Sequence, residues 1–72
     1  MTKLPVLSGK EVCKALGKAG YIIDHQTGSH IILRNLTPPH RRLVVPNHNE
    51  IAKGTLKAIL HQAGLTTDEL LN

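Results

Sequence analysis

The sequence predicts a small α+β domain in two layers, with the element order α-β-β-β-α and a short helical turn at the end. Two segments with apolar residues at helical spacing lie towards the two ends of the chain. Between them lie three short segments rich in β-branched residues, and a glycine-containing turn separates the first two. A three-stranded antiparallel sheet can bury one face beneath both helices, which gives two layers.

The chain has 72 residues, which is enough for one hydrophobic core and not for two. We therefore expect residues 1–72 to form a single domain. A domain of this size buries only about 60% of the surface that its unfolded chain exposes, so it is only marginally stabilised by its core.

The first helix is predicted to begin at Ser8. Ser8 and Glu11 have the spacing of a capping box, in which each side chain accepts a backbone N–H of the other residue. Gly20 is well placed to end the helix. One face of this helix carries apolar residues and another carries lysines. A basic face of this kind more often lies in solvent than contacts phosphates. The buried stripe consists of Val12, Ala15, Leu16 and Ala19, and the basic stripe of Lys10, Lys14 and Lys18.

The first two strands are predicted over Tyr21–Gln26 and His30–Asn35. Gly28 lies in the turn between them, where glycine can adopt positive φ without steric cost. Alternation along the second strand places His30 and Arg34 on one face. A histidine beside a tight turn is well placed to transfer protons, and a cation on the same face suits a phosphate.

The third strand is predicted over Arg41–Pro46, after a stiff loop at Thr37–His40. Its centre is a run of apolar residues, so we expect this strand to be central in the sheet or covered on both faces. The run consists of Leu43, Val44 and Val45.

The second helix is predicted to begin after Asn49, a candidate N-cap, and to end at Gly64. Thr66 and Glu69 repeat the capping-box spacing and begin a short helical turn over Thr67–Leu71. The buried stripe of the second helix consists of Leu56, Ile59, Leu60 and Ala63.

The charge balance favours a polyanionic partner. Nine Lys and Arg residues stand against five Asp and Glu residues, which gives a net charge of +4. Tyr21 is the only aromatic residue, so the chain cannot build the stacking platform that many single-strand binders use. The double-stranded RNA-binding domain has the predicted element order, and it recognises RNA by shape and phosphate contacts without such a platform.

Cysteine usage and hydropathy predict a cytoplasmic protein that is not in a membrane. Cys13 is the only cysteine, so no internal disulfide can form. No apolar stretch approaches the roughly 20 residues that span a bilayer, and charged and proline residues interrupt the N-terminal segment. The five histidines show no metal-ligand spacing, so we expect neither a metal nor another cofactor.

In several short segments the chain resembles the HicA toxins of bacterial toxin–antitoxin pairs, also called the YcfA-like family. Each matching segment is short, but their order and spacing extend over about 65 residues. The segments are Ser8-Gly9-Lys10-Glu11-Val12 with Leu16, Gly20-Tyr21, Gly28-Ser29-His30, Val45-Pro46 with His48, Lys53-Gly54-Thr55-Leu56 with Ile59-Leu60, and Ala63-Gly64-Leu65.

The resemblance implies a double-stranded RNA-binding-like fold and a ribonuclease that cleaves mRNA and arrests translation. It also implies a catalytic histidine at the position of His30 and a HicB antitoxin that holds the toxin inactive. From the residues alone, a turn histidine that caps a carbonyl is about equally plausible for His30. The resemblance favours catalysis, with Gly28 and Ser29 forming the turn that supports His30.

RNA can be cleaved without a metal because its own 2′-hydroxyl can attack the adjacent phosphorus. The protein then supplies a base for that hydroxyl, an acid for the leaving 5′-oxygen, and positive charge for the phosphate. His48 is the candidate for the second proton-transfer group because it too matches the family pattern, although a histidine at a helix entry is more often structural. Candidate RNA-binding residues are Lys10, Lys14, Arg34, Arg41, Arg42, Lys53 and Lys57.

The leading hypothesis is therefore the toxin of a type II toxin–antitoxin system, a metal-independent endoribonuclease in which His30 is the general acid or base. Its partners would be mRNA and a HicB-type antitoxin. The alternative is a non-catalytic double-stranded RNA-binding module, in which His30 only shapes the turn. A third hypothesis is a protein-interaction module whose basic faces meet an acidic partner.

Overall fold

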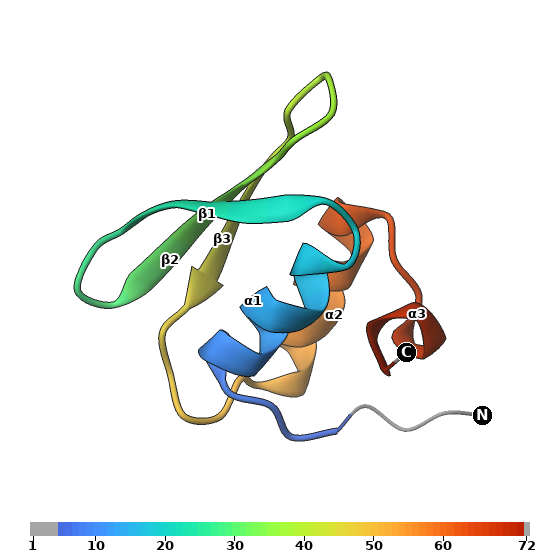
Figure 1. Cartoon of the computed structure of the whole chain (residues 1–72). Coiled ribbons are helices and arrows are strands. Elements are labelled where there is room, and N and C mark those ends of the chain that lie inside the picture. The colour runs from blue at the N-terminus through green and yellow to red at the C-terminus, as the bar shows by residue number, and fades with distance from the viewer. Residues whose placement is uncertain (1–4, 72) are drawn as a thin grey trace.

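The structure, a computed structural model, describes residues 5–71 and has the predicted order of elements (Figure 1). Three strands form one antiparallel sheet in the order β1-β2-β3. The α+β class predicted from the sequence is therefore confirmed. The elements are α1 (Gly9–Gly17), β1 (Tyr21–Gln26), β2 (His30–Asn35), β3 (Arg42–Pro46), α2 (Lys53–Ala63) and α3 (Thr67–Leu71).

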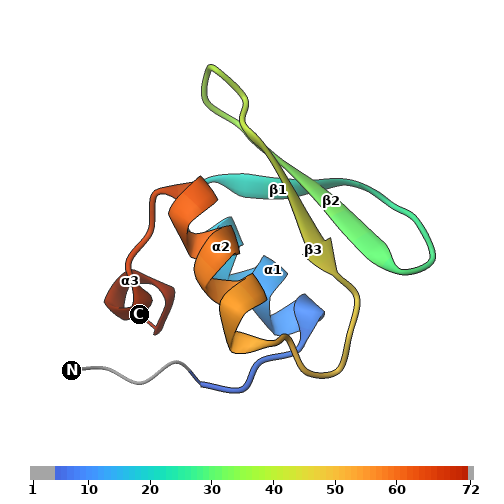
Figure 2. The ribbon, with the colours of Figure 1, turned by 180° about the vertical axis from the view of Figure 1, so that it is seen from behind.

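The two longer helices lie against one face of the sheet, and neither covers the opposite face (Figures 1 and 2). Paired residues of an antiparallel sheet share a face, so the register assigns each strand residue to one side. On the covered face lie Tyr21, Ile23, Gln26, Ile31, Leu33, Leu43 and Val45. On the other side, which we call the open face, lie Ile22, His25, His30, Ile32, Arg34, Arg42, Val44 and Pro46.

The hydrophobic core lies between the covered face and the helices. Leu33 of the central strand is fully buried and pairs with Leu43. The core joins these strand residues to the buried stripes of both helices, as the helical spacing predicted. The helical members are Val12, Cys13, Leu16, Leu56, Ile59 and Leu60, with Leu70 from α3.

The expectation that the third strand is central or covered on both faces is wrong. The central strand is β2, and β3 is an edge strand that begins at Arg42. Leu43 and Val45 are buried, whereas Val44 between them is 42% exposed on the open face. A short apolar run does not distinguish an edge strand with one exposed valine from a buried central strand, because both consist of the same residue types.

Both predicted capping boxes are present. The Ser8 hydroxyl accepts the N–H of Glu11 at 3.1 Å, and the Glu11 carboxylate accepts the N–H of Ser8 at 3.0 Å. The bond from the Ser8 N–H, followed by the effect of the Ser8 hydroxyl, favours the ionised carboxylate and so lowers the pKa of Glu11. Thr66 and Glu69 form the same pair of bonds, at 3.2 Å and 3.0 Å, at the start of α3.

The N-cap of α2 differs from the prediction. The helix begins at Lys53 with Ala52 as its N-cap, and no side chain caps it, so the expectation that Asn49 is the cap is wrong. Ile51 is 5% exposed and its backbone N–H donates to the Leu7 carbonyl at 2.8 Å. Ile51 is therefore buried in the core before the helix begins.

The backbone of residues 46–48 packs closely against Gly9. Its N–H donates to the His48 carbonyl at 2.9 Å, and a Cβ at this position would collide with the Pro46 carbonyl oxygen. This contact ties the start of α1 to the loop that follows β3. Only glycine fits here without a backbone shift.

We expect Gly9→Ala to lower the free energy of unfolding by about 1–3 kcal/mol, because the backbone must move to admit the methyl group. Gly54→Ala is the matched control, since nothing lies within 4 Å of a Cβ there. Alanine in this helix should stabilise by about 0.5–1 kcal/mol. Urea unfolding measures both, and a Gly9→Ala protein as stable as the wild type would contradict the packing described.

Candidate active site

His30 lies at the start of β2, and hydrogen bonds hold the turn before it on both sides. The His30 carbonyl accepts the Thr27 N–H at 2.9 Å, and the Ser29 carbonyl accepts the Asn47 N–H at 2.8 Å. The His30 ring is exposed, and its Nδ1 lies 3.2 Å from the Ser29 hydroxyl oxygen. Hydrogen bonds of the turn thus hold the backbone of His30 in place while its ring is exposed to solvent.

Gly28 does not have the backbone conformation expected for it. The described glycines at positive φ are Gly20 and Gly64, so Gly28 lies outside that region. A Cβ at Gly28 would meet no atom within 4 Å. The turn is therefore held by the backbone hydrogen bonds around His30, and it does not depend on a left-handed glycine.

Asp24, His25 and Arg34 form an ionisable cluster on the open face. The sequence analysis did not predict this cluster. His25 Nδ1 lies 3.0 Å from a carboxylate oxygen of Asp24, and Arg34 Nη2 lies 3.8 Å from the same oxygen. The register of β1 shifts between Ile23 and His25, which is a β-bulge at Asp24. A bulge of one residue moves all later side chains to the opposite face.

Without the bulge, strict alternation from Tyr21 would place His25 on the covered face. With it, His25 pairs with Ile32 on the open face, and Gln26 turns to the covered face. The signal available in the sequence was weak: two histidines near one turn, at an odd separation. That separation gives no indication of a shared face unless the bulge is known.

Ile32 is the buried residue of the open face. Ile32 is only 4% exposed and does not belong to the core beneath the sheet. Its neighbours on its own strand are His30 and Arg34, and its partners across the sheet are His25 and Val44. Because no helix covers this face, the side chains around Ile32 must cover it. Two histidines and an arginine are thus among the residues that surround this buried isoleucine on the open face.

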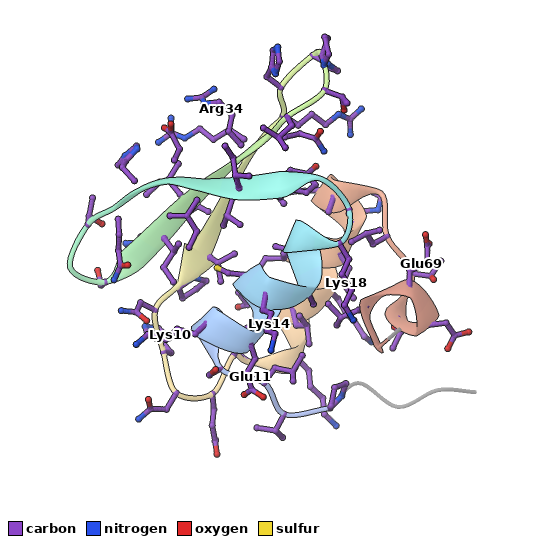
Figure 3. All side chains as sticks on the ribbon, viewed as in Figure 1. Lys10, Glu11, Lys14, Lys18, Arg34 and Glu69 are labelled. Carbon is purple, nitrogen blue, oxygen red and sulfur yellow. The ribbon has the colours of Figure 1, made fainter. Side chains whose placement is uncertain are left out.

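The candidate RNA-binding residues divide between the two sides of the sheet. Arg34 and Arg42 are cross-strand partners on the open face. Figure 3 shows Arg34 projecting away from the helices, while Lys10 and Lys14 lie on α1 with Lys18, on the other side of the sheet. The open face and the α1 lysines are thus separate basic surfaces.

The remaining candidates belong to the helical layer or its edge. Arg41 precedes β3, and its guanidinium donates to the Gln62 carbonyl at 3.4 Å, near the end of α2. Lys53 and Lys57 are exposed on α2. His48 is exposed in the loop before α2, and its carbonyl accepts the Gly9 N–H. The backbone of His48 therefore has a structural role, whatever its ring does.

A groove of about 330 Å³ lies between α1 and the covered face of β1 and β2. Its lining is mainly apolar and includes two lysines. Burial raises the pKa of the Cys13 thiol in this groove, which is consistent with the small-hydrophobe role expected for Cys13. The lining residues are Lys10, Cys13, Lys14, Ile23, Gln26 and Ile31.

The described part of the chain contains neither a metal-binding cluster nor a membrane-spanning helix. Residues 5–71 contain no cluster of three or more His, Cys, Asp or Glu side chains that could hold a metal ion. Within the same residues, no helix has the length and apolar character required to cross a membrane.

Comparison with known families identifies the chain. The family model described as the HicA toxin of bacterial toxin–antitoxin systems matches residues 9–65 of the 72. The chain belongs to the HicA toxin family. The HicA match extends from α1 to the residue after Gly64, so it includes His30 and the whole open face. A comparison with curated proteins finds no match. The resemblance inferred from the residues is confirmed, and with it the role of a toxin in a toxin–antitoxin pair.

Proposed function

We propose that this HicA family member is a metal-independent endoribonuclease that cleaves mRNA, with His30 as a proton-transfer group. The observation that carries the proposal is the placement of His30: exposed, at the edge of a hydrogen-bonded turn, and on the same face as two arginines. The toxin family supports an activity that harms the cell that makes it. A net charge of +4 favours a polyanionic substrate.

The proposed reaction uses the RNA's own nucleophile. The 2′-hydroxyl loses its proton, and its oxygen forms a bond to the adjacent phosphorus. The bond from phosphorus to the 5′-oxygen breaks, and that oxygen gains a proton. His30 performs one of these two proton transfers, and Arg34 and Arg42 stabilise the negative charge that builds up on the phosphate.

A HicB-type antitoxin would neutralise the toxin by covering the open face. Two aliphatic side chains are exposed there among the cations, Ile22 at 48% and Val44 at 42%. An acidic surface with apolar contacts would fit this face and exclude RNA from His30. The open face can thus serve both the substrate and the inhibitor, which makes their binding mutually exclusive.

The α1 lysines favour a second candidate function, a non-catalytic double-stranded RNA-binding module. Lys10, Lys14 and Lys18 lie along one side of α1, apart from the open face (Figure 3). Such a stripe can contact phosphates without any part in catalysis. This candidate predicts RNA binding that leaves the RNA intact.

The test is cleavage of a long RNA by the wild-type chain in excess EDTA, followed by identification of the ends. We expect fragments with a 2′,3′-cyclic phosphate and a 5′-hydroxyl, because attack by the 2′-hydroxyl leaves the phosphate on the 3′ side. Fragments with 5′-phosphate ends would contradict this mechanism. Binding without cleavage would overturn the nuclease and leave the binding module.

A further inference from the structure

Cleavage by this route needs two proton transfers, and His30 can perform only one of them at a time. The open face carries another histidine, His25, on the neighbouring strand. His30 lies two residues before Ile32, and His25 pairs with Ile32, so the two histidines are diagonal neighbours on one face. The Cα atoms of diagonal neighbours in an antiparallel pair lie about 7–8 Å apart, and their Cβ atoms lie somewhat closer.

This spacing suits a phosphate held between two imidazoles. A proton-transfer group must lie within about 2.6–3.2 Å of the oxygen that it serves. Attack and departure occur at oxygens on opposite sides of the phosphorus, so the two groups must approach from two directions. Ile32 pairs with His25 and lies two residues after His30, and it is 4% exposed, so it lies between the two histidine positions on this face.

The partners of the two rings differ in charge. His25 Nδ1 lies 3.0 Å from the Asp24 carboxylate, which can orient the ring through Nδ1. His30 Nδ1 lies 3.2 Å from the neutral Ser29 hydroxyl. Two cations on β2 and β3, Arg34 and Arg42, share this face. A carboxylate at Nδ1 orients an imidazole for proton transfer at Nε2, whereas His30 has only a neutral hydroxyl at that position.

We propose that His25 is the second proton-transfer group of the site, the general acid that protonates the leaving 5′-oxygen, with Asp24 positioning its ring and His30 acting as the base. The base takes the proton of the 2′-hydroxyl, and His25 gives its Nε2 proton to the 5′-oxygen as the P–O bond breaks. Protons therefore balance over the cleavage step. The inference rests on the proposed endoribonuclease function, and it assigns to His25 the role for which His48 was the sequence candidate.

The decisive experiment compares two RNA substrates that differ in one atom. In the second substrate, sulfur replaces the 5′-bridging oxygen at the cleavage position, so the leaving group is a thiolate that needs no proton. We expect His25→Ala to cleave the ordinary RNA about 10²–10⁴-fold more slowly than wild type and the sulfur substrate at nearly the wild-type rate. His30→Ala should be slow on both substrates.

The pH profile and two further variants separate chemistry from folding. A general acid must be protonated, so loss of His25 should remove the alkaline limb of the bell-shaped profile of kcat/KM. Asp24→Asn should lower kcat on the ordinary RNA with little change in KM, and the sulfur substrate should restore it. His61→Ala, an exposed histidine on α2, should behave like wild type on both substrates. Circular dichroism checks that each variant is folded.

Each outcome decides a separate point. If wild type cleaves the ordinary RNA and His25→Ala does so equally fast, this inference is wrong while the proposed function stands. If the defect of His25→Ala is the same on both substrates, His25 is not the acid. If wild type cleaves neither substrate, the proposed function fails and the assignment of His25 fails with it.

Discussion

Replacing His30 by alanine is expected to reduce the rate of RNA cleavage by about 10²–10⁴-fold and to abolish growth arrest when the toxin is expressed. The reduction follows from the loss of one of two proton transfers at the phosphate. Binding should change little, because Arg34 and Arg42 remain on the same face to hold the RNA backbone. Initial rates on a long RNA in EDTA, at saturating protein, measure the effect.

The fold of His30→Ala should be intact. The ring is exposed, and its hydrogen bond is to the adjacent Ser29, while the carbonyl that holds the turn belongs to the backbone. The urea midpoint and circular dichroism spectrum should therefore match those of wild type. His61→Ala serves as the control for a general effect of losing an exposed histidine. Equal cleavage by wild type and His30→Ala would mean that His30 is structural.

Replacing Leu33 by alanine should have the largest effect on stability. Leu33 is fully buried in the central strand, and its partner Leu43 belongs to the same core. Leucine-to-alanine substitutions in cores cost about 2–5 kcal/mol, because they remove apolar contacts and leave a cavity. The whole domain is stabilised by about 0.05–0.15 kcal/mol per residue, which is about 4–11 kcal/mol for 72 residues. The variant should therefore lose a large part of its stability.

Leu36→Ala is the matched control for this substitution. Leu36 is 61% exposed and lies just beyond the end of β2, so its loss should cost less than about 0.5 kcal/mol. Urea unfolding monitored by circular dichroism gives both free energies. Similar values for the two variants would show that the core is not centred on β2 as described.

Local signals in the sequence were sufficient to predict much of the secondary structure. Each capping box joins residues three apart, Ser8 with Glu11 and Thr66 with Glu69, so nothing distant is needed to form it. The bounds of β1 and β2 were also predicted as observed, because β-branched runs flank a short turn. The family segments could be recognised for the same reason, since each is a short run of adjacent residues.

Predictions that depended on distant partners were wrong or absent. The start of α2 follows the burial of Ile51 and its bond to Leu7, which lies 44 residues earlier in the chain. The requirement for glycine at position 9 comes from the Pro46 carbonyl, which only the folded chain brings near. In each case the local structure depends on an atom far away in the sequence. A pattern that extends over a few residues cannot indicate such a contact.

The sequence by itself determined that His30 stands at the start of a strand beside a turn, on the same face as Arg34. Alternation within one strand is enough for that conclusion. Only the tertiary structure places His25 on the same face of the sheet as these two residues. The bulge at Asp24 turns His25 to the open face, and pairing with Ile32 brings it beside His30. The register between two strands depends on the packing of the whole sheet, so no spacing within β1 could reveal it.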